Sequence, residues 1–172
     1  MQKFIGCVLI LSATTGGGIL YGAELKQYLE KLFYLRHVIY LLKGELEYSH
    51  ASLGEIFSRL STKVKPPYCL WFRRMEKQIW ERKEEDFFQI WTLSIETDLK
   101  KLQLKKTHIA QLNDIGNFLG QLDQMAAVKA LELYLNRLGM EIEKEREHLE
   151  VRKRISSWLG VMGGLFLVVI LM

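Results

Sequence analysis

Side chains that could bind a metal ion or act as nucleophiles are few and scattered in this chain. Cys7 lies in an apolar run near the start and Cys69 in a charged stretch, so the two cysteines predict reduced thiols and no disulfide framework. The four histidines stand far apart, without a cysteine or carboxylate at the spacing that zinc requires: His37, His50, His108 and His148. The sequence therefore predicts no metal site.

Motifs for phosphate binding or acyl transfer are also missing from the sequence. No P-loop, G-x-G-x-x-G or G-x-S-x-G occurs, and the glycines at 16–18 lie in an apolar segment with no lysine and serine or threonine after them. Glu45 and Glu47 could serve as an acid and a base, but residues i and i+2 of a helix face different directions. We therefore expect no enzyme activity, no cofactor and no small-molecule substrate.

Charge separates the middle of the chain from its two ends. All 20 acidic residues lie between positions 24 and 150, and of the 24 basic residues only Lys3 lies outside positions 26–154. A nucleic-acid groove needs basic residues massed with few acids among them, so a net charge of +4 argues against a nucleic-acid partner. Only two prolines stand among many helix formers, which indicates an all-α chain.

Residues 155–172 carry no charge and follow the basic triplet Arg152, Lys153 and Arg154. As a helix with a rise of about 1.5 Å per residue, this segment would extend about 27 Å, close to the ~30 Å hydrocarbon thickness of a bilayer. Residues 4–23 are uncharged as well. We expect both segments to be transmembrane helices, the first as an uncleaved anchor; the alternative for residues 4–23 is a signal peptide with a weak cleavage site near Thr15.

Basic residues near the two predicted spans indicate how the chain is oriented. Apart from Lys3, all those within about twenty residues of a span belong to the middle: Lys26, Lys31, Arg36, Lys43, Arg137, Lys144, Arg146, Arg152, Lys153 and Arg154. By the positive-inside rule, residues 24–154 form a cytoplasmic domain and both termini lie on the other side of the membrane.

Apolar residues at spacings of three and four divide residues 24–154 into about six helices. The first continues from the N-terminal span to about Tyr48, with one apolar stripe: Leu25, Tyr28, Leu29, Leu32, Leu35, Ile39, Leu42 and Leu46. Ser52 and Glu55 form a capping box that begins the second, and Pro67 suits the first turn of the third. We expect a loop over residues 61–67 and a buried face on the third helix: Leu70, Trp71, Met75, Ile79 and Trp80.

Acidic residues precede the fourth and the sixth expected helices. Glu84, Glu85 and Asp86 suit the positive end of a fourth helix that buries residues from Phe87 to Leu102. The fifth is expected over residues 107–122 with a buried face: Ile109, Leu112, Ile115, Phe118 and Leu119. Asp123 is a cap for the sixth, which runs without a helix breaker into the C-terminal span. The predicted fold is an all-α cytoplasmic bundle of about six helices, flanked by one N-terminal and one C-terminal transmembrane helix.

Glycines four residues apart occur in both predicted spans. Gly18 and Gly22 repeat this spacing in the first span, and Gly160 and Gly164 repeat it in the second. Small residues at this spacing let membrane helices approach closely. We therefore expect these glycines to pack the two spans against each other or against a span of another protein.

Several segments together resemble the stage III sporulation protein AB family of endospore-forming bacteria. The resemblance spans the chain and rests on these residues: Lys3, Ile5, Gly6, the runs at 9–11 and 14–15, Leu42, the run at 45–48, His50, Leu53, Leu119, Gly120, Asp123 and the run at 157–165. Ala127 departs from the family pattern, which has glutamine four residues after the aspartate, so no role of that glutamine transfers to this chain.

The resemblance implies a subunit of the membrane complex that joins mother cell and forespore, with a helical domain similar to that of the type II secretion platform protein. Its expected partners are a cytoplasmic ATPase and other membrane subunits of that complex, besides the lipid bilayer of the mother-cell membrane around the forespore. Glu45, Glu47 and Tyr48 are the expected partner-binding residues, because they match the family stretch and end the first long helix. Two other classes stay open: a membrane-bound enzyme whose site assembles only in three dimensions, and a helical signalling relay.

Overall fold

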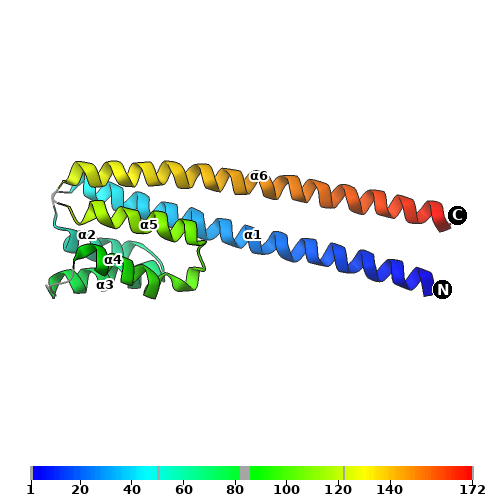
Figure 1. Cartoon of the computed structure of the whole chain (residues 1–172), viewed down its shortest axis with the longest axis horizontal. Coiled ribbons are helices and arrows are strands. Elements are labelled where there is room, and N and C mark those ends of the chain that lie inside the picture. Colours follow the sequence, from blue (N-terminus) through cyan, green and yellow to red (C-terminus); the bar gives the residue numbers. More distant parts are fainter. Residues whose placement is uncertain (1, 50, 82–85, 122, 172) are drawn as a thin grey trace. The chain divides into compact units, whose positions relative to one another are not determined.

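The computed structural model describes the backbone of residues 2–49, 51–81, 86–121 and 123–171. Side chains are described for residues 23–49, 51–81, 86–121, 123–151 and 155. All regular structure in these ranges is helical: one short 3₁₀-helix and six α-helices, which are labelled in Figure 1. The predicted all-α fold is thus confirmed for this part of the chain.

The chain divides into two units, residues 1–33 with 140–172 and residues 34–139. The first unit holds the start of α1 (Gln2–Tyr48) and the end of α6 (Gln124–Leu171). Both helices run without interruption through the segments predicted to span the membrane, as the sequence indicated. Among the side chains described, no helical stretch is both long and apolar enough to cross a bilayer. The predicted spans lie almost wholly outside those residues, as do Gly18, Gly22, Gly160 and Gly164.

The second unit, residues 34–139, is a bundle of antiparallel neighbours. Between the last part of α1 and the first part of α6 it contains α2 (Leu53–Lys63), α3 (Tyr68–Trp80), α4 (Phe87–Asp98), the 3₁₀-helix η1 (Lys100–Leu102) and α5 (Lys106–Leu119). Helix α2 packs on α3, α3 on α4 and α4 on α5. The predicted buried stripe of α1 is confirmed in this unit, because Leu35, Ile39 and Leu42 are fully buried and Leu46 is buried as well.

Local capping signals place two of the helix starts. The Ser52 hydroxyl accepts a hydrogen bond from the Glu55 backbone N–H at 3.4 Å, and the Glu55 carboxylate accepts one from the Ser52 N–H at 3.1 Å. This reciprocal pair is the predicted capping box of α2. At α6 the Asp123 carboxylate accepts from the Ala126 N–H at 3.1 Å, which confirms the predicted cap.

Three helix boundaries and three exposures differ from the sequence-based expectation. Helix α2 continues to Lys63 inside the expected loop, α4 ends at Asp98 before η1, and α5 ends at Leu119, ahead of 122. Leu70, Trp80 and Phe118 were predicted to be buried but are 52%, 62% and 41% exposed. In α3 the predicted burial of Trp71 and Met75 is confirmed, and Tyr68 and Phe72 complete the buried face at spacings of three and four.

An aromatic cluster fills the core between α2, α3 and α4. The ring of Trp71 lies 4.8 Å from that of Trp91 and 4.9 Å from that of Phe72, and Phe72 stacks on Phe57 at 5.6 Å. The Trp71 Nε1 donates to the Ser94 hydroxyl at 2.9 Å, and that hydroxyl donates to the Trp91 carbonyl at 2.7 Å. Large rings supply much buried apolar surface, and their N–H groups are satisfied inside the core.

One end of the bundle gathers the turns of three helical hairpins, α1–α2, α3–α4 and α5–α6. Helices α1, α3 and α5 end there and α2, α4 and α6 begin there, at Tyr48, Leu53, Trp80, Phe87, Leu119 and Gln124 (Figure 1). We call this the hairpin end. Its elements touch one another: Gly54 lies against the Trp80 ring, Gly120 lies against the Phe87 ring, and the Gln124 amide donates to the Leu46 carbonyl. The expected partner-binding residues therefore belong to this end.

Candidate partner-binding site

The three expected contact residues lie in the last turn of α1, but they have different surroundings. Tyr48 is 84% exposed, which makes it the most exposed large hydrophobic residue among those described. Glu47 is also open to solvent and forms an ion pair with Lys43 one turn earlier, at 3.0 Å. Glu45 faces the neighbouring helix instead. The structure thus presents Tyr48 and Glu47 to a partner and holds Glu45 within the bundle.

Glu45 ties α1 to α2 through two basic side chains. Its carboxylate lies 2.6 Å from the Lys63 ammonium and 3.6 Å from the Arg59 guanidinium, and its own side chain is only 16% exposed. The hydrogen bond from Lys63 holds the pKa of the Glu45 carboxyl below its ordinary value, while partial burial opposes that shift. These contacts join residues far apart in sequence, so Glu45 has a structural role that periodicity alone could not indicate.

The lowered pKa of Glu45 predicts a pH-dependent contribution to stability. Because the folded-state pKa is depressed, this contribution is complete above the ordinary carboxyl pKa of about 4.3 and is lost as the pH falls through the lower folded-state value. We expect Glu45→Gln to reduce the free energy of unfolding by about 0.5–1 kcal/mol at neutral pH. Urea unfolding at neutral pH and near pH 3 should show this difference shrinking with acidification.

The matched control for Glu45 is Glu96, an exposed acid of α4. Glu96 has no ion-pair partner among the described residues, so Glu96→Gln should leave the free energy of unfolding nearly unchanged at both pH values. A Glu45→Gln effect of equal size at both pH values would contradict the proposed titration of this carboxylate.

Two further exposed residues at the hairpin end were not identified from the sequence. Trp80 at the end of α3 is 62% exposed, and Met125 at the start of α6 is 83% exposed. Trp80 was assigned to a buried face because its type fits an apolar stripe, and Met125 carried no signal beyond its hydrophobicity. Exposed aromatic residues and methionines are enriched where proteins bind partners. Together with Tyr48 they make the hairpin end the candidate interface.

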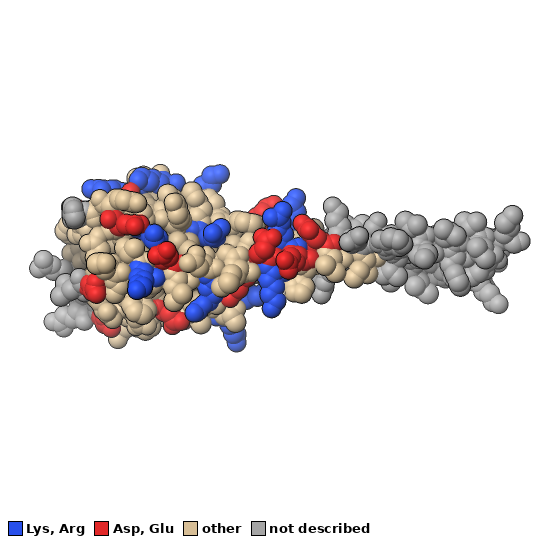
Figure 2. Space-filling model, turned by 90° about the horizontal axis from the view of Figure 1, so that it is seen from above, with Lys and Arg blue, Asp and Glu red and all other residues tan. Residues whose placement is uncertain are grey.

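Charged groups on one face of the molecule are mixed in sign. On the face of the molecule in view in Figure 2, Lys and Arg lie among Asp and Glu. Within the described residues no group of three or more His, Cys, Asp or Glu could hold a metal ion. The histidine that is most buried in that part of the chain, His108, is 3% exposed near the start of α5.

One known protein family matches nearly the whole chain. The family model described as stage III sporulation protein AB matches residues 3–172. The chain belongs to the stage III sporulation protein AB family. This confirms the resemblance found in the sequence, and membership in the family supports a role in sporulation.

A curated relative and a solved structure from the family show how far the likeness extends. Stage III sporulation protein AB of Bacillus subtilis (strain 168) is 27% identical over 173 residues, which cover 100% of each chain. A solved structure of stage III sporulation protein AB (SpoIIIAB) superposes with a TM-score of 0.63 at 20% identity, over 72% of this chain and 97% of that chain. At that identity the superposition establishes the shared fold.

Proposed function

We propose that this chain is a non-enzymatic assembly subunit of the sporulation complex that joins mother cell and forespore. In this proposal it is anchored in the mother-cell membrane by residues 4–23 and 155–172, and its bundle is a cytoplasmic platform for an ATPase of the same complex. Family membership, the uncharged terminal segments and the basic residues that flank them on the side of the bundle support this. The proposed similarity to the type II secretion platform protein is part of the same hypothesis.

One observation supports the choice of the hairpin end as the platform surface. Tyr48 stands 84% exposed at the end of a long helix whose preceding turns are anchored in the core, where Leu42 and Leu46 are buried. A rigidly mounted aromatic side chain loses little conformational entropy when it binds, and tyrosines are enriched among the residues that contribute most to interfaces. We infer that Tyr48 is the main contact and that Glu47 adds a charged contact beside it.

The test compares two exposed tyrosines of the same helix. The tagged full-length chain, its Tyr48→Ala/Glu47→Lys variant and a Tyr40→Ala variant are used to recover the ATPase of the complex. Tyr40 is 64% exposed on α1 but lies about two turns before the hairpin end, so it is the matched control. Loss of one central tyrosine typically costs about 2 kcal/mol, so we expect recovery to fall about tenfold or more for the first variant only.

Glu45 is left unchanged in this experiment because its reversal would face Lys63 and Arg59 and disturb the fold. Circular dichroism should give the same helical content for all three proteins. Equal recovery of the ATPase by the wild type and the Tyr48→Ala/Glu47→Lys variant would reject the site. Recovery by none of the three would reject the ATPase as a direct partner.

A further inference from the structure

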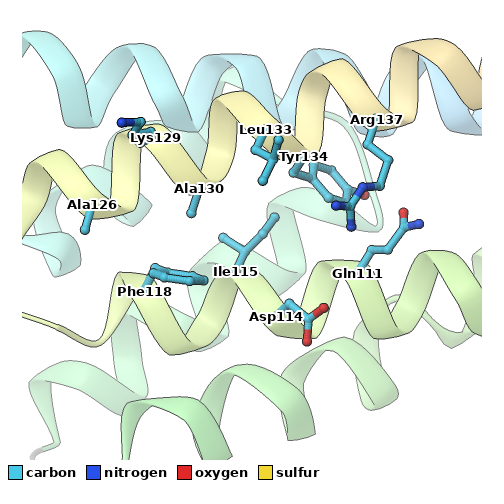
Figure 3. Close-up of a pocket in the computed structure, with 10 residues that line it drawn as sticks. All are labelled: Gln111, Asp114, Ile115, Phe118, Ala126, Lys129, Ala130, Leu133, Tyr134 and Arg137. Carbon is cyan, nitrogen blue, oxygen red and sulfur yellow. The ribbon is translucent and has the colours of Figure 1, made fainter.

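A groove between α5 and α6 lies outside the contact residues proposed for the ATPase. It encloses about 490 Å³ and lies within residues 34–139. Figure 3 shows its two walls: Gln111, Asp114, Ile115 and Phe118 come from α5, and Ala126, Ala130, Leu133 and Arg137 come from α6. The two helices form an antiparallel hairpin, so residues of α5 and α6 at similar distances from the turn face each other.

The groove exposes apolar side chains of unequal size on its two walls. Phe118 on α5 is 41% exposed and Leu133 on α6 is 60% exposed, although both could have been buried in a closed hairpin. Across from Phe118, at the same end of the groove, the α6 wall carries the small side chains of Ala126 and Ala130 (Figure 3). One wall thus offers a large ring and the other offers space for a ring of that kind.

The charged residues of the groove are also of opposite sign on opposite walls. The α6 wall carries Lys129 nearer the turn and Arg137 farther from it, and the α5 wall carries Asp114. Asp114 and Arg137 both lie toward the end of the groove that is farther from the turn (Figure 3). In the described part of the chain neither of these two side chains has an ion-pair partner. Each is therefore available to a charge supplied by another molecule.

We propose that this groove is the contact between two copies of the chain. In a dimer with its two-fold axis along the groove, α5 of one copy lies opposite α6 of the second copy at the same height along the axis. Phe118 then enters the space beside Ala126 and Ala130 of the second copy, and Asp114 meets Arg137 of the second copy. Both contacts occur twice, because the surface of a two-fold interface must complement itself.

Complementarity of size and charge on one surface selects a second copy over other occupants. A partner helix of a different protein would need its own acid opposite Arg137 and its own base opposite Asp114. The second copy supplies both at the required places without any further assumption. The proposal concerns residues 34–139 and does not depend on the binding of an ATPase.

The test uses full-length chains that carry two different tags and are expressed together. Asp114→Arg makes the side chains at positions 114 and 137 both positive in each copy, and Arg137→Asp makes them both negative. We expect each variant alone to lose co-recovery of the second tag by about tenfold, since both ion pairs become repulsive. When the two variants are expressed together, Arg at 114 faces Asp at 137 and Arg137 faces Asp114, so co-recovery should return.

Controls separate this contact from association elsewhere in the chain. Arg73→Asp, which reverses an exposed charge of α3 outside the groove, should leave co-recovery unchanged. Phe118→Ser should weaken it without charge reversal, and circular dichroism should show unchanged helical content for every variant. Wild-type levels of co-recovery for both single charge variants would overturn the proposal and assign association to another surface. Absence of co-recovery for the wild type, or failure of the mixed pair to restore it, would overturn it as well.

Discussion

Replacing Gly116 with alanine should lower the free energy of unfolding by about 2 kcal/mol. A Cβ at this position would lie 2.4 Å from Cδ1 and 2.8 Å from Cγ of Trp91. Trp91 cannot move aside freely, because it is fully buried and its Nε1 donates to the Leu112 carbonyl at 2.9 Å, one turn earlier on α5. Overpacking of this kind costs about 1–3 kcal/mol, and strain on the indole hydrogen bond adds to it.

Gly44 provides the matched control for this prediction. It also lies inside a helix, but a Cβ there would meet nothing within 4 Å. Gly44→Ala should therefore raise the free energy of unfolding by up to about 1 kcal/mol, the difference in helix propensity. That same gain offsets part of the Gly116→Ala loss. Urea unfolding followed by circular dichroism measures both, and a Gly116→Ala variant as stable as Gly44→Ala would contradict the close approach of α4 and α5.

Replacing Ser94 with alanine should cost about 1–3 kcal/mol, because it leaves the Trp71 indole N–H buried without its acceptor. Ser94 is 1% exposed and Trp71 is fully buried, so water cannot take the place of the hydroxyl. Thr97→Ala is the matched control on the same helix. Its hydroxyl also donates to a backbone carbonyl, that of Leu93 at 2.7 Å, but it is exposed. We expect a change within about 0.5 kcal/mol for this variant.

A double-mutant cycle tests whether the indole N–H is the cause. In a Trp71→Phe background the donor is absent, so Ser94→Ala should cost clearly less than it does in the wild-type protein. Thermal or urea unfolding of the four proteins gives the coupling free energy. If Ser94→Ala costs the same free energy of unfolding with and without the Trp71 donor, the loss arises from packing alone.

Much of the fold could be predicted because its signals are local. Ser52 and Glu55 are three residues apart, and Asp123 lies next to the helix that it caps, so the helix starts were evident from short segments. The stripe along α1 is long enough for periodicity to identify its buried face. The all-α fold and the family follow from features of this kind, and the structure and the family comparison confirm both.

The remaining errors come from contacts that depend on distant residues. In α3 several apolar side chains compete for the buried face, and only packing on α2 and α4 decides that Trp71 and Met75 enter the core while Leu70 and Trp80 stay outside. Phe118 was expected to be buried on α5, yet the hairpin with α6 leaves it at an open groove. Such choices depend on the arrangement of neighbouring helices, which hydrophobicity along one helix does not specify.

The candidate site shows the same limit. The sequence located Glu45, Glu47 and Tyr48 at the end of a helix, which is where the structure has them. It could not reveal that Glu45 is engaged by Lys63 from α2, a residue distant in sequence. It also could not reveal that Trp80 and Met125 emerge at the same end of the bundle. Partner binding at this surface and the packing of Gly18, Gly22, Gly160 and Gly164 remain predictions.

The distribution of tryptophans gives the bundle an optical property of its own. Trp71 and Trp91 are fully removed from water, whereas Trp80 is 62% exposed at the hairpin end. Indole emission shifts to longer wavelength in water and is quenched by solutes such as acrylamide that reach the ring. The three tryptophans whose side chains are described, Trp71, Trp80 and Trp91, therefore contribute a core component and a surface component to the fluorescence, and Trp158 lies outside the described side chains. A Trp158→Phe variant keeps only the three tryptophans of the bundle, and in it a ligand that covers the hairpin end would shield Trp80 from quenching without an attached label.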